Sequence, residues 1–405
     1  MSIVQKRQIF DALRFHGYRF YWVGALLLYG TRWMQMIILG WLVLELTNSA
    51  FLVGLVGALQ WLPMLLGAFT GLIADRLNRR VMLIWLQFSS SLVCLLLGFL
   101  IITGLIQIWQ IMILSLLLGV TWAIDFPCAR ALIPDLVGKE NILNAIALDT
   151  SGMTFMGVIG SIAGGQFISA IGMGNSCYLL GVAYFASALS FFLIGKTKQV
   201  SLAEDTSIAA DIVKGIKYMF QNQVMRAVLV ITIIMNIFIF PYRQLLPIYA
   251  RDILEIGPAG LGYLAAAQGV GAFVSAVTLA YLGKVRYPGI VFQGGSFSAA
   301  VLLIVFAPST IYPLSLGSLI VFGLAVAMFG TMQSTILLGL SAEEMRGRVM
   351  GILSVCIGVT SLGMLAFGAI ADVIGASLVI VFGAIISAAS IMVVFFFMPV
   401  LRKLH

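Results

Sequence analysis

Long apolar stretches, bounded by charged residues or by clusters of glycine, proline and asparagine, dominate the chain. A helix that crosses a bilayer needs about 20 apolar residues. Stretches of that kind cover residues 20–44, 51–74, 81–103, 107–128, 145–170, 176–195, 226–250, 260–283, 289–307, 312–339, 347–371 and 376–399. Their apolar character is continuous, which favours helices over the alternating strands of a membrane barrel. The pattern predicts an all-α integral membrane protein with twelve transmembrane helices.

Composition excludes a soluble globular protein. Of the 405 residues, 61% are hydrophobic and 9% are charged, whereas soluble domains contain about 25% charged residues. The net charge is +8, but no basic segment is combined with aromatic residues that could stack on nucleic-acid bases. We therefore expect no nucleic-acid partner. The four cysteines form no CxxC pair, and we expect neither a metal site nor a cofactor.

Basic residues mark alternate loops. All of the 23 lysines and arginines except Arg32, Arg243 and Arg251 lie in the two terminal segments or in the loops around 75–80, 130–139, 196–226, 284–286 and 346–348. Basic loops remain on the cytoplasmic side of a membrane. We therefore expect both termini and the central loop to be cytoplasmic.

The central loop divides the chain into an N-terminal bundle (1–195), a linker (196–225) and a C-terminal bundle (226–405). Apolar residues of the linker recur at helical spacing, while two lysines face elsewhere. The apolar set is Ile208, Ile212, Ile216 and Met219, and the lysines are Lys214 and Lys217. This pattern predicts an amphipathic helix on the inner membrane surface; the alternative is a solvated linker.

The two halves resemble each other. An offset of 208 residues places Gly54, Ala58 and Gln60 on Gly262, Ala266 and Gln268. Two six-helix bundles related by an internal repeat are typical of secondary transporters, whose substrate site lies between the halves near the middle of the membrane. We therefore expect a small-molecule substrate.

The loop between the second and third spans reads GLIADRLNRR (71–80). Its charged residues Asp75, Arg76, Arg79 and Arg80 can form a cluster that holds one bundle against the other and breaks when the bundles move. The alternative is a basic anchor of the cytoplasmic side. A carboxylate at a membrane edge needs a partner. The presence of Asp75 therefore favours the gate interpretation over the basic anchor.

This loop resembles the G-x-x-x-D-R-x-G-R-R signature of the major facilitator superfamily, with Asn78 where glycine is usual. Other segments resemble the drug and siderophore exporter branch of that superfamily, the enterobactin-exporter-like or transmembrane secretion effector group. They are GT (30–31), WMQ (33–35), WLV (41–43), LTNS (46–49), ARALIPDLV (129–137), LPIYARD (246–252) and RGRVMG (346–351). In the fifth span, Gly157, Gly160, Ser161, Gly164 and Gly165 resemble the antiporter motif, with Ser161 in place of its proline.

The resemblance implies a bacterial inner-membrane exporter of small amphiphilic compounds that works by alternating access as a proton antiporter and is a monomer in the bilayer. Proton-coupled uptake of a small polar or lipid-like solute is the alternative. In the superfamily an acid at the end of the fourth span joins the loop cluster, which implies a gate role for Asp125. The arginine that many proton-coupled members carry in that span is absent. No HExxH or GxSxG motif is present, so we do not expect an enzyme.

Charged and amide residues within the spans are the candidate site residues, because each is costly in a bilayer without a partner or a cavity. Arg32 is expected to face a substrate cavity or to pair with a distant acid, and Arg243 to face the cavity or to pair at an outer gate with Glu45 or Asp252. Gln35, Asn236 and Gln268 are the further substrate-binding candidates.

Two carboxylates are candidates for proton coupling. Asp149 lies about one turn into the fifth span, where a carboxylate that faces a partly dry cavity can exchange protons with a gradient. The alternative is a carboxylate that caps the start of a helix. Asp125 is the second candidate besides its gate role. Arg32 and Arg243 would give the cavity a positive potential, which favours anions over lipophilic cations. The expected substrates are acidic secondary metabolites, siderophore-like compounds or anionic drugs.

Overall fold

The computed structural model describes residues 10–67, 78–195, 208–282, 285–342 and 345–404. Helices of several kinds make up these residues, and no strand occurs among them. Ten helices of the described chain are long and apolar enough to cross a membrane, and Ala50–Leu66 is a shorter apolar segment. The all-helical membrane architecture is confirmed, and the number twelve stays a prediction.

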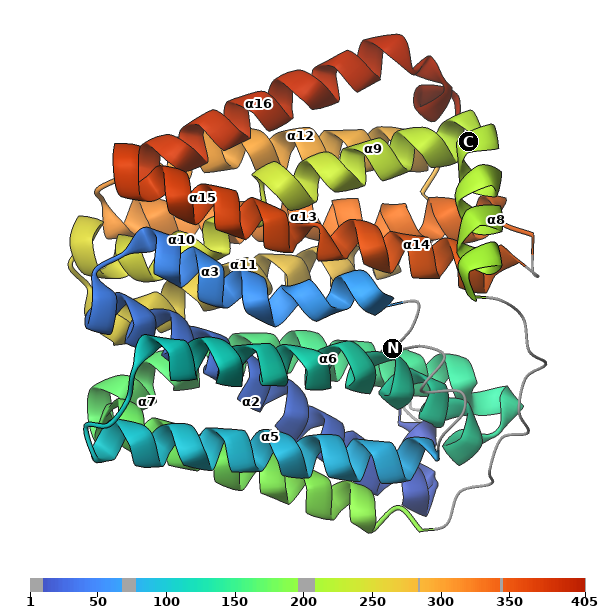
Figure 1. Cartoon of the computed structure of the whole chain (residues 1–405). Helices are drawn as coiled ribbons and strands as arrows, with labels where there is room; N and C mark the ends of the chain where they lie inside the picture. The colour runs from blue at the N-terminus through green and yellow to red at the C-terminus, as the bar shows by residue number, and fades with distance from the viewer. Residues whose placement is uncertain (1–9, 68–77, 196–207, 283–284, 343–344, 405) are drawn as a thin grey trace.

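The described residues of the first half contain five α-helices after the short 3-10 helix η1 (Asp11–Arg14). They are α2 (His16–Thr47), α3 (Ala50–Trp61) with its 3-10 continuation η2 (Leu62–Leu66), α5 (Arg79–Ile102), α6 (Ile108–Val137) and, after η3 (Lys139–Asn141), α7 (Ile142–Phe192). These helices pack mainly on one another and occupy the lower part of Figure 1, with α3 at mid-height below α15. We call them the first helix group.

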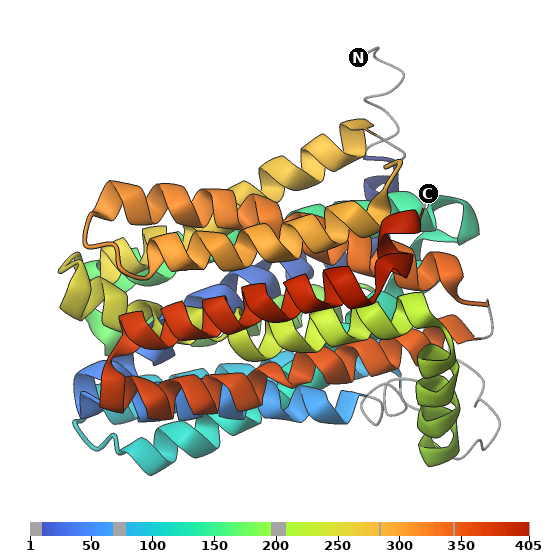
Figure 2. The same ribbon diagram turned by 90° about the horizontal axis from the view of Figure 1, so that it is seen from above.

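The second helix group comprises the helices from α9 onward. They are α9 (Gln223–Phe238), α10 (Tyr242–Ile248), η4 (Tyr249–Ile253), α11 (Gly257–Leu282), α12 (Pro288–Phe306), α13 (Tyr312–Leu340), α14 (Arg346–Gly358), α15 (Thr360–Ile374), α16 (Ala376–Phe397) and η6 (Pro399–Lys403). Between the groups, α8 (Ile208–Gln221) lies across the helix ends (Figure 2) and packs on α14. Met219 of α8 is buried, whereas Lys214 and Lys217 are exposed.

Three expected boundaries differ in the structure. Spans five and six are joined without a loop, because Gly172 adopts φ 80° and ψ 167° and turns α7 within one residue; a positive φ is accessible to glycine at little cost. The seventh span is broken before Pro241, which lacks the N–H that a continuous helix needs. Helix α6 continues to Val137, past the expected end of the fourth span.

Helix ends define two sides of the molecule. Helices η1, α8 and η6 lie at one end, which we call the terminus end, and the turns at Asn48, Gly172 and Gly375 lie at the opposite end, which we call the far end (Figure 1). Residues Asp75 and Arg76 of the expected gate lie outside the described residues.

Near the far end, the two groups approach each other through pairs of glycines. A Cβ atom on Gly54 of α3 would lie 2.9 Å from the Cα of Gly368 on α15, and one on Gly165 of α7 would lie 3.0 Å from the Cα of Gly262 on α11. Helices can pack backbone to backbone only where such small residues meet. Gly165 of the antiporter-like motif thus takes part in the contact between the groups, whereas Gly160 and Gly164 pack against α2.

A carboxylate adds polar contacts at the same end. Asp372 of α15 accepts hydrogen bonds from the backbone N–H groups of Ala50 (2.6 Å) and Phe51 (3.1 Å) and from the hydroxyl of Ser49 (2.7 Å). These donors form the N-terminus of α3, where unpaired N–H groups and the helix dipole favour an anion. The far end is therefore closed in this structure.

Replacement of Gly54 by alanine tests the role of the glycine crossings. The added Cβ would lie 2.5 Å from the backbone carbonyl oxygen of Met364, which cannot move aside as a flexible side chain can. We expect Gly54→Ala to separate the groups at the far end. Spin labels at Asn175 and Thr310, on opposite groups, should report longer and broader distance distributions by double electron–electron resonance.

Gly317→Ala is the matched control, because a Cβ there meets nothing within 4 Å. This variant should keep the distance distribution of the parent chain. If Gly54→Ala and Gly317→Ala gave the same distribution, the glycine crossings would not be what closes the far end.

Candidate functional site

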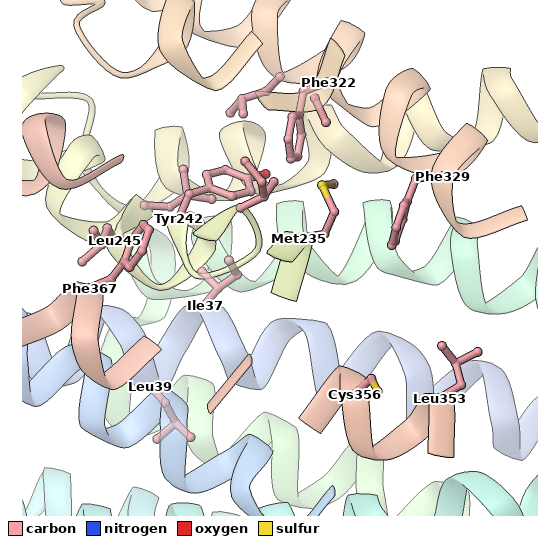
Figure 3. Close-up of a cluster of buried hydrophobic side chains, with 14 of the residues drawn as sticks. Ile37, Leu39, Met235, Tyr242, Leu245, Phe322, Phe329, Leu353, Cys356 and Phe367 are labelled. Atoms are coloured by element: carbon pink, nitrogen blue, oxygen red, sulfur yellow. The ribbon is translucent and has the colours of Figure 1, made fainter. Parts of the chain in front are cut away.

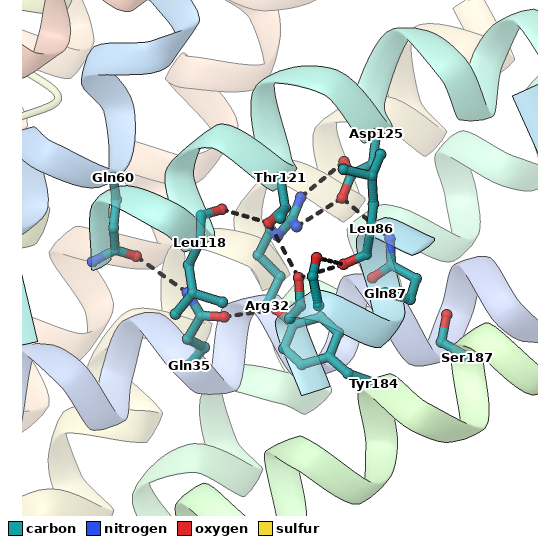
Figure 4. Close-up of polar contacts among 12 residues, drawn as sticks. Arg32, Gln35, Gln60, Leu86, Gln87, Leu118, Thr121, Asp125, Tyr184 and Ser187 are labelled. Atoms are coloured by element: carbon teal, nitrogen blue, oxygen red, sulfur yellow. Dashed lines mark hydrogen bonds and ion pairs between the residues drawn. The ribbon is translucent and has the colours of Figure 1, made fainter. Parts of the chain in front are cut away.

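A buried ion pair lies at the centre of the first group. The guanidinium of Arg32 on α2 donates two parallel hydrogen bonds to the carboxylate of Asp125 on α6, at 3.0 Å and 2.8 Å (Figure 4). Arg32 is 8% exposed and Asp125 is 1% exposed. Gln87 of α5 donates to the same carboxylate at 3.4 Å. Two-point pairing of this kind compensates both charges and fixes three helices relative to one another.

Amide and hydroxyl groups continue this network toward α3. Gln35, one turn after Arg32, accepts a hydrogen bond from the Tyr184 hydroxyl at 2.7 Å and lies 3.4 Å from the amide oxygen of Gln60 (Figure 4). The Trp122 ring covers the Arg32 guanidinium at 5.2 Å. Gln35 is thus joined to the first group by neutral hydrogen bonds.

Three of the expected gate residues are described by the structure, and their partners lie within the first group. Asp125 contacts Arg32, and the carboxylate that Arg79 reaches among the described residues is Asp135, at 3.2 Å. Arg80 donates to the backbone carbonyls of Phe191 and Phe192 at the end of α7. Among the described residues, Asp125 and Arg79 thus have different charged partners.

Asp149 lies in a second polar cluster, nearer the terminus end. Its carboxylate accepts hydrogen bonds from the hydroxyls of Tyr21 and Tyr29, each at 3.1 Å. Asp149 is 1% exposed, and within the described ranges no basic group lies at ion-pair distance from it. The two tyrosines are eight residues apart on α2, so their hydroxyls reach Asp149 from positions about two turns apart.

Arg243 lies at the interface between the groups. The break at Pro241 begins the short helix α10, from which Arg243 donates to the amide oxygen of Gln268 at 2.8 Å. Its guanidinium stacks over Trp33 of the first group, with 5.1 Å between Cζ and the ring centre. Neither partner is charged.

A cavity of about 40 Å³ surrounds this arginine. Its lining comes from α2, α10 and α11 and includes Trp33, Ile37, Gly40, Arg243, Pro247 and Gln268. Behind it, the Tyr242 hydroxyl donates to Gln268 at 2.6 Å, and the Tyr242 ring packs edge-on against Phe322 (Figure 3). The cavity therefore has a basic group held by rigid aromatic residues.

Asn236 takes part in a separate cluster within the second group. Its amide oxygen accepts from the Thr360 hydroxyl at 2.6 Å, and its nitrogen donates to the Thr232 carbonyl at 2.8 Å. Of the expected substrate-binding residues, the structure brings Arg243 and Gln268 together at the cavity, whereas Gln35, Arg32 and Asn236 lie in internal networks. Trp33 and Tyr242 were not among the expected site residues.

A double-mutant cycle tests whether Arg32 and Asp125 form a structural unit. Removal of one partner leaves a buried, uncompensated charge, which costs about 3–5 kcal/mol. We expect Arg32→Gln and Asp125→Asn to lower the thermal unfolding temperature strongly, and the double variant to recover part of the loss. Unfolding in detergent can be followed by thiol labelling of the four buried cysteines.

The exposed pair of Arg14 with Asp11 provides the control, because the Arg14 side chain is 67% exposed and such pairs contribute about 0–1 kcal/mol. Arg14→Gln should leave the unfolding temperature nearly unchanged. Losses that simply add in the double variant would mean that Arg32 and Asp125 act independently.

Comparison with known proteins places the chain among transporters. The family model described as "Transmembrane secretion effector" matches residues 8–404. The chain is 24% identical to the staphyloferrin A transporter of Staphylococcus aureus, covering 88% of this chain and 90% of that protein. It is 23% identical to the enterobactin exporter EntS of Shigella boydii, covering 76% and 73%.

Solved structures share the fold at low identity. A bacterial homologue of the human lysosomal transporter Spinster, in an inward-facing and unoccupied conformation, matches with a TM-score of 0.72 and 14% identity over 95% of this chain and 98% of the other. The nucleoside transporter NupG matches with a TM-score of 0.70, at 14% identity over 96% and 99%. These similar proteins are transporters, which points to a non-enzyme. The chain belongs to the transmembrane secretion effector family of the major facilitator superfamily.

Proposed function

We propose that the chain is a secondary active exporter of small acidic amphiphiles, siderophore-like or drug-like, which it moves by alternating access in exchange for protons. The observation that carries this proposal is Arg243, a basic side chain at the interface between the helix groups whose partners Gln268 and Trp33 are uncharged. A positive charge with low-dielectric surroundings favours an anion and penalises a cation.

The pairing of Arg32 with Asp125 favours Arg243 over Arg32 as the arginine that binds the substrate. Asp125 compensates the charge of Arg32, so this arginine offers no net charge to a ligand. Arg243 is partly accessible and lines the interface cavity. The substrate's acidic group would therefore bind at Arg243, with Trp33 and Gln268 beside it.

The size of the cavity supports movement of the helix groups during transport. A volume of about 40 Å³ holds only a few water molecules, whereas ligand sites measure roughly 300–1,000 Å³. A drug-sized substrate therefore requires the groups to separate around Arg243. The glycine crossings close the far end, so separation would begin at the terminus end, which we assign to the cytoplasm of a bacterial inner-membrane protein.

Asp149 is the proposed proton carrier. Its hydrogen-bond partners are two hydroxyls, which can accompany either the carboxylate or the carboxylic acid because a hydroxyl both donates and accepts. The paired carboxylate of Asp125, by contrast, would leave Arg32 without a counter-ion on protonation. Protonation at Asp149 can thus change the contact between α2 and α7.

Proteoliposomes with an imposed pH gradient test the function. The siderophores named for two relatives, staphyloferrin A and enterobactin, are the probes. We expect gradient-driven movement of at least one of them, and we expect Asp149→Asn to abolish accumulation while binding changes less than about threefold. Glu140→Gln, an exposed acid at the terminus end, is the control. Undiminished gradient-driven accumulation by Asp149→Asn would exclude Asp149 as the carrier.

Ligand charge tests the role of Arg243. A dansylated fatty acid and its methyl ester differ by one negative charge, and their affinities can be compared by fluorescence. A charge-assisted hydrogen bond contributes about 1.5–3 kcal/mol, so Arg243→Gln should weaken binding of the acid by roughly ten- to hundredfold and that of the ester little. Arg243→Lys keeps the charge and should retain the preference. Equal losses for acid and ester would make Arg243 a structural residue.

A further inference from the structure

An apolar groove lies on the outer surface of the first group, near the terminus end. It has a volume of about 240 Å³ between α5 and the second part of α7. Its lining includes Ile84, Trp85, Phe88, Phe185, Leu189 and Phe192. Trp85 is 65% exposed and Phe192 is 60% exposed, so these rings face the surrounding lipid in a membrane.

The second group carries a corresponding groove. It has a volume of about 210 Å³ between α12 and α16, and its lining includes Ile290, Gln293, Gly294, Phe297, Ile391 and Phe395. Four lining positions of the two grooves correspond at a constant separation of 206 residues. The pairs are Ile84 with Ile290, Phe88 with Gly294, Phe185 with Ile391, and Leu189 with Phe395. The two grooves thus occupy equivalent places in the two halves.

An arginine lies at the mouth of each groove. The Arg80 guanidinium lies over the Phe192 ring at 5.6 Å, and its Nε and one Nη donate to the last carbonyls of α7. The Arg402 guanidinium lies over the Phe395 ring at 4.3 Å. Its buried Nε makes no hydrogen bond within the part of the chain that the structure describes. Both arginines lie at helix ends, where the basic side chains of membrane proteins can reach the lipid headgroups.

Gln293 provides a further unpaired group in the second groove. It is 2% exposed, and neither its amide oxygen nor its amide nitrogen has a hydrogen-bond partner among the described residues. Its counterpart at the same separation of 206 residues, Gln87, donates to Asp125. A buried amide without a partner is costly in a bilayer, which favours a ligand that brings a polar group, such as the ester of a lipid, into the groove.

We propose that the two grooves bind one anionic phospholipid each, with an acyl chain in the groove and the phosphate at Arg80 or Arg402. An apolar groove with a basic group at its mouth suits a lipid with an acyl chain and a net negative charge. It suits a lipid with a zwitterionic headgroup less well. The sites lie on the outer helices α5, α12 and α16 and on the second part of α7, away from the Arg243 cavity. This lipid binding is therefore separate from substrate binding.

Fluorescence quenching by brominated lipids tests the first groove. Trp85 lines it, and the difference between the parent chain and Trp85→Phe isolates its signal among the seven tryptophans. In bilayers that mix brominated phosphatidylglycerol with unlabelled phosphatidylcholine, or the reverse, we expect a preference for phosphatidylglycerol of about fivefold at Trp85. Arg80→Gln should reduce it toward one, and Arg80→Lys should retain it.

Moving the reporter tests the second groove. Val291 is the counterpart of Trp85 at the same separation, so Val291→Trp in the Trp85→Phe background reports on that groove. Arg402→Gln should remove the preference there, and Arg80→Gln should not. Lys217→Gln, an exposed basic residue of α8 at the same end, is the control for general surface charge. Equal quenching by the two lipids, or a preference that Lys217→Gln lowers as much as the groove arginines do, would overturn the proposal.

Discussion

The ion pair between Arg32 and Asp125 is the interaction on which the first helix group depends. The interior of a bilayer does not solvate a charged group, so burial of Arg32 or Asp125 alone would be costly. Each is tolerated because the other lies at hydrogen-bond distance. The pair joins α2 to α6, and Gln87 adds α5. Helix α2, which carries both the tyrosines of the Asp149 cluster and Trp33 of the cavity, is thereby held in position against α5 and α6.

The three buried or interfacial charged groups differ in their partners, and we assign each a role according to its partner. Arg32 has a carboxylate, Asp149 has two hydroxyls and Arg243 has an amide and an indole ring. A fully compensated charge suits structure, a carboxylate among neutral donors suits proton exchange, and an arginine without a counter-ion suits an anionic ligand. Because Arg243 and Trp33 belong to different groups, a ligand at Arg243 acts directly on the contact that must change during transport.

The apolar pattern predicted the membrane helices well, because a bilayer requires long apolar segments that satisfy their own backbone hydrogen bonds. It could not show that Gly172 turns one helix into the next, since a glycine between two apolar segments is equally consistent with a loop. The need of Arg32 for a cavity or an acid was predictable from the cost of burial, but the choice between them was not. Asp125 is 93 residues away in sequence, and only the rotation of α6 shows that it faces Arg32. The tyrosines around Asp149 were missed for the same reason, because their spacing has meaning only once α7 is known to lie beside α2.

The most direct test of the central claim, that Arg243 receives an anionic substrate between the helix groups, is a cryo-electron microscopy structure of the chain saturated with staphyloferrin A. Density for an acidic group within hydrogen-bond distance of the Arg243 guanidinium, beside Trp33 and Gln268 and with the groups parted around an enlarged cavity, is the expected result. Ligand density that lies elsewhere, with Arg243 still bonded to Gln268 as in the free protein, would contradict the claim.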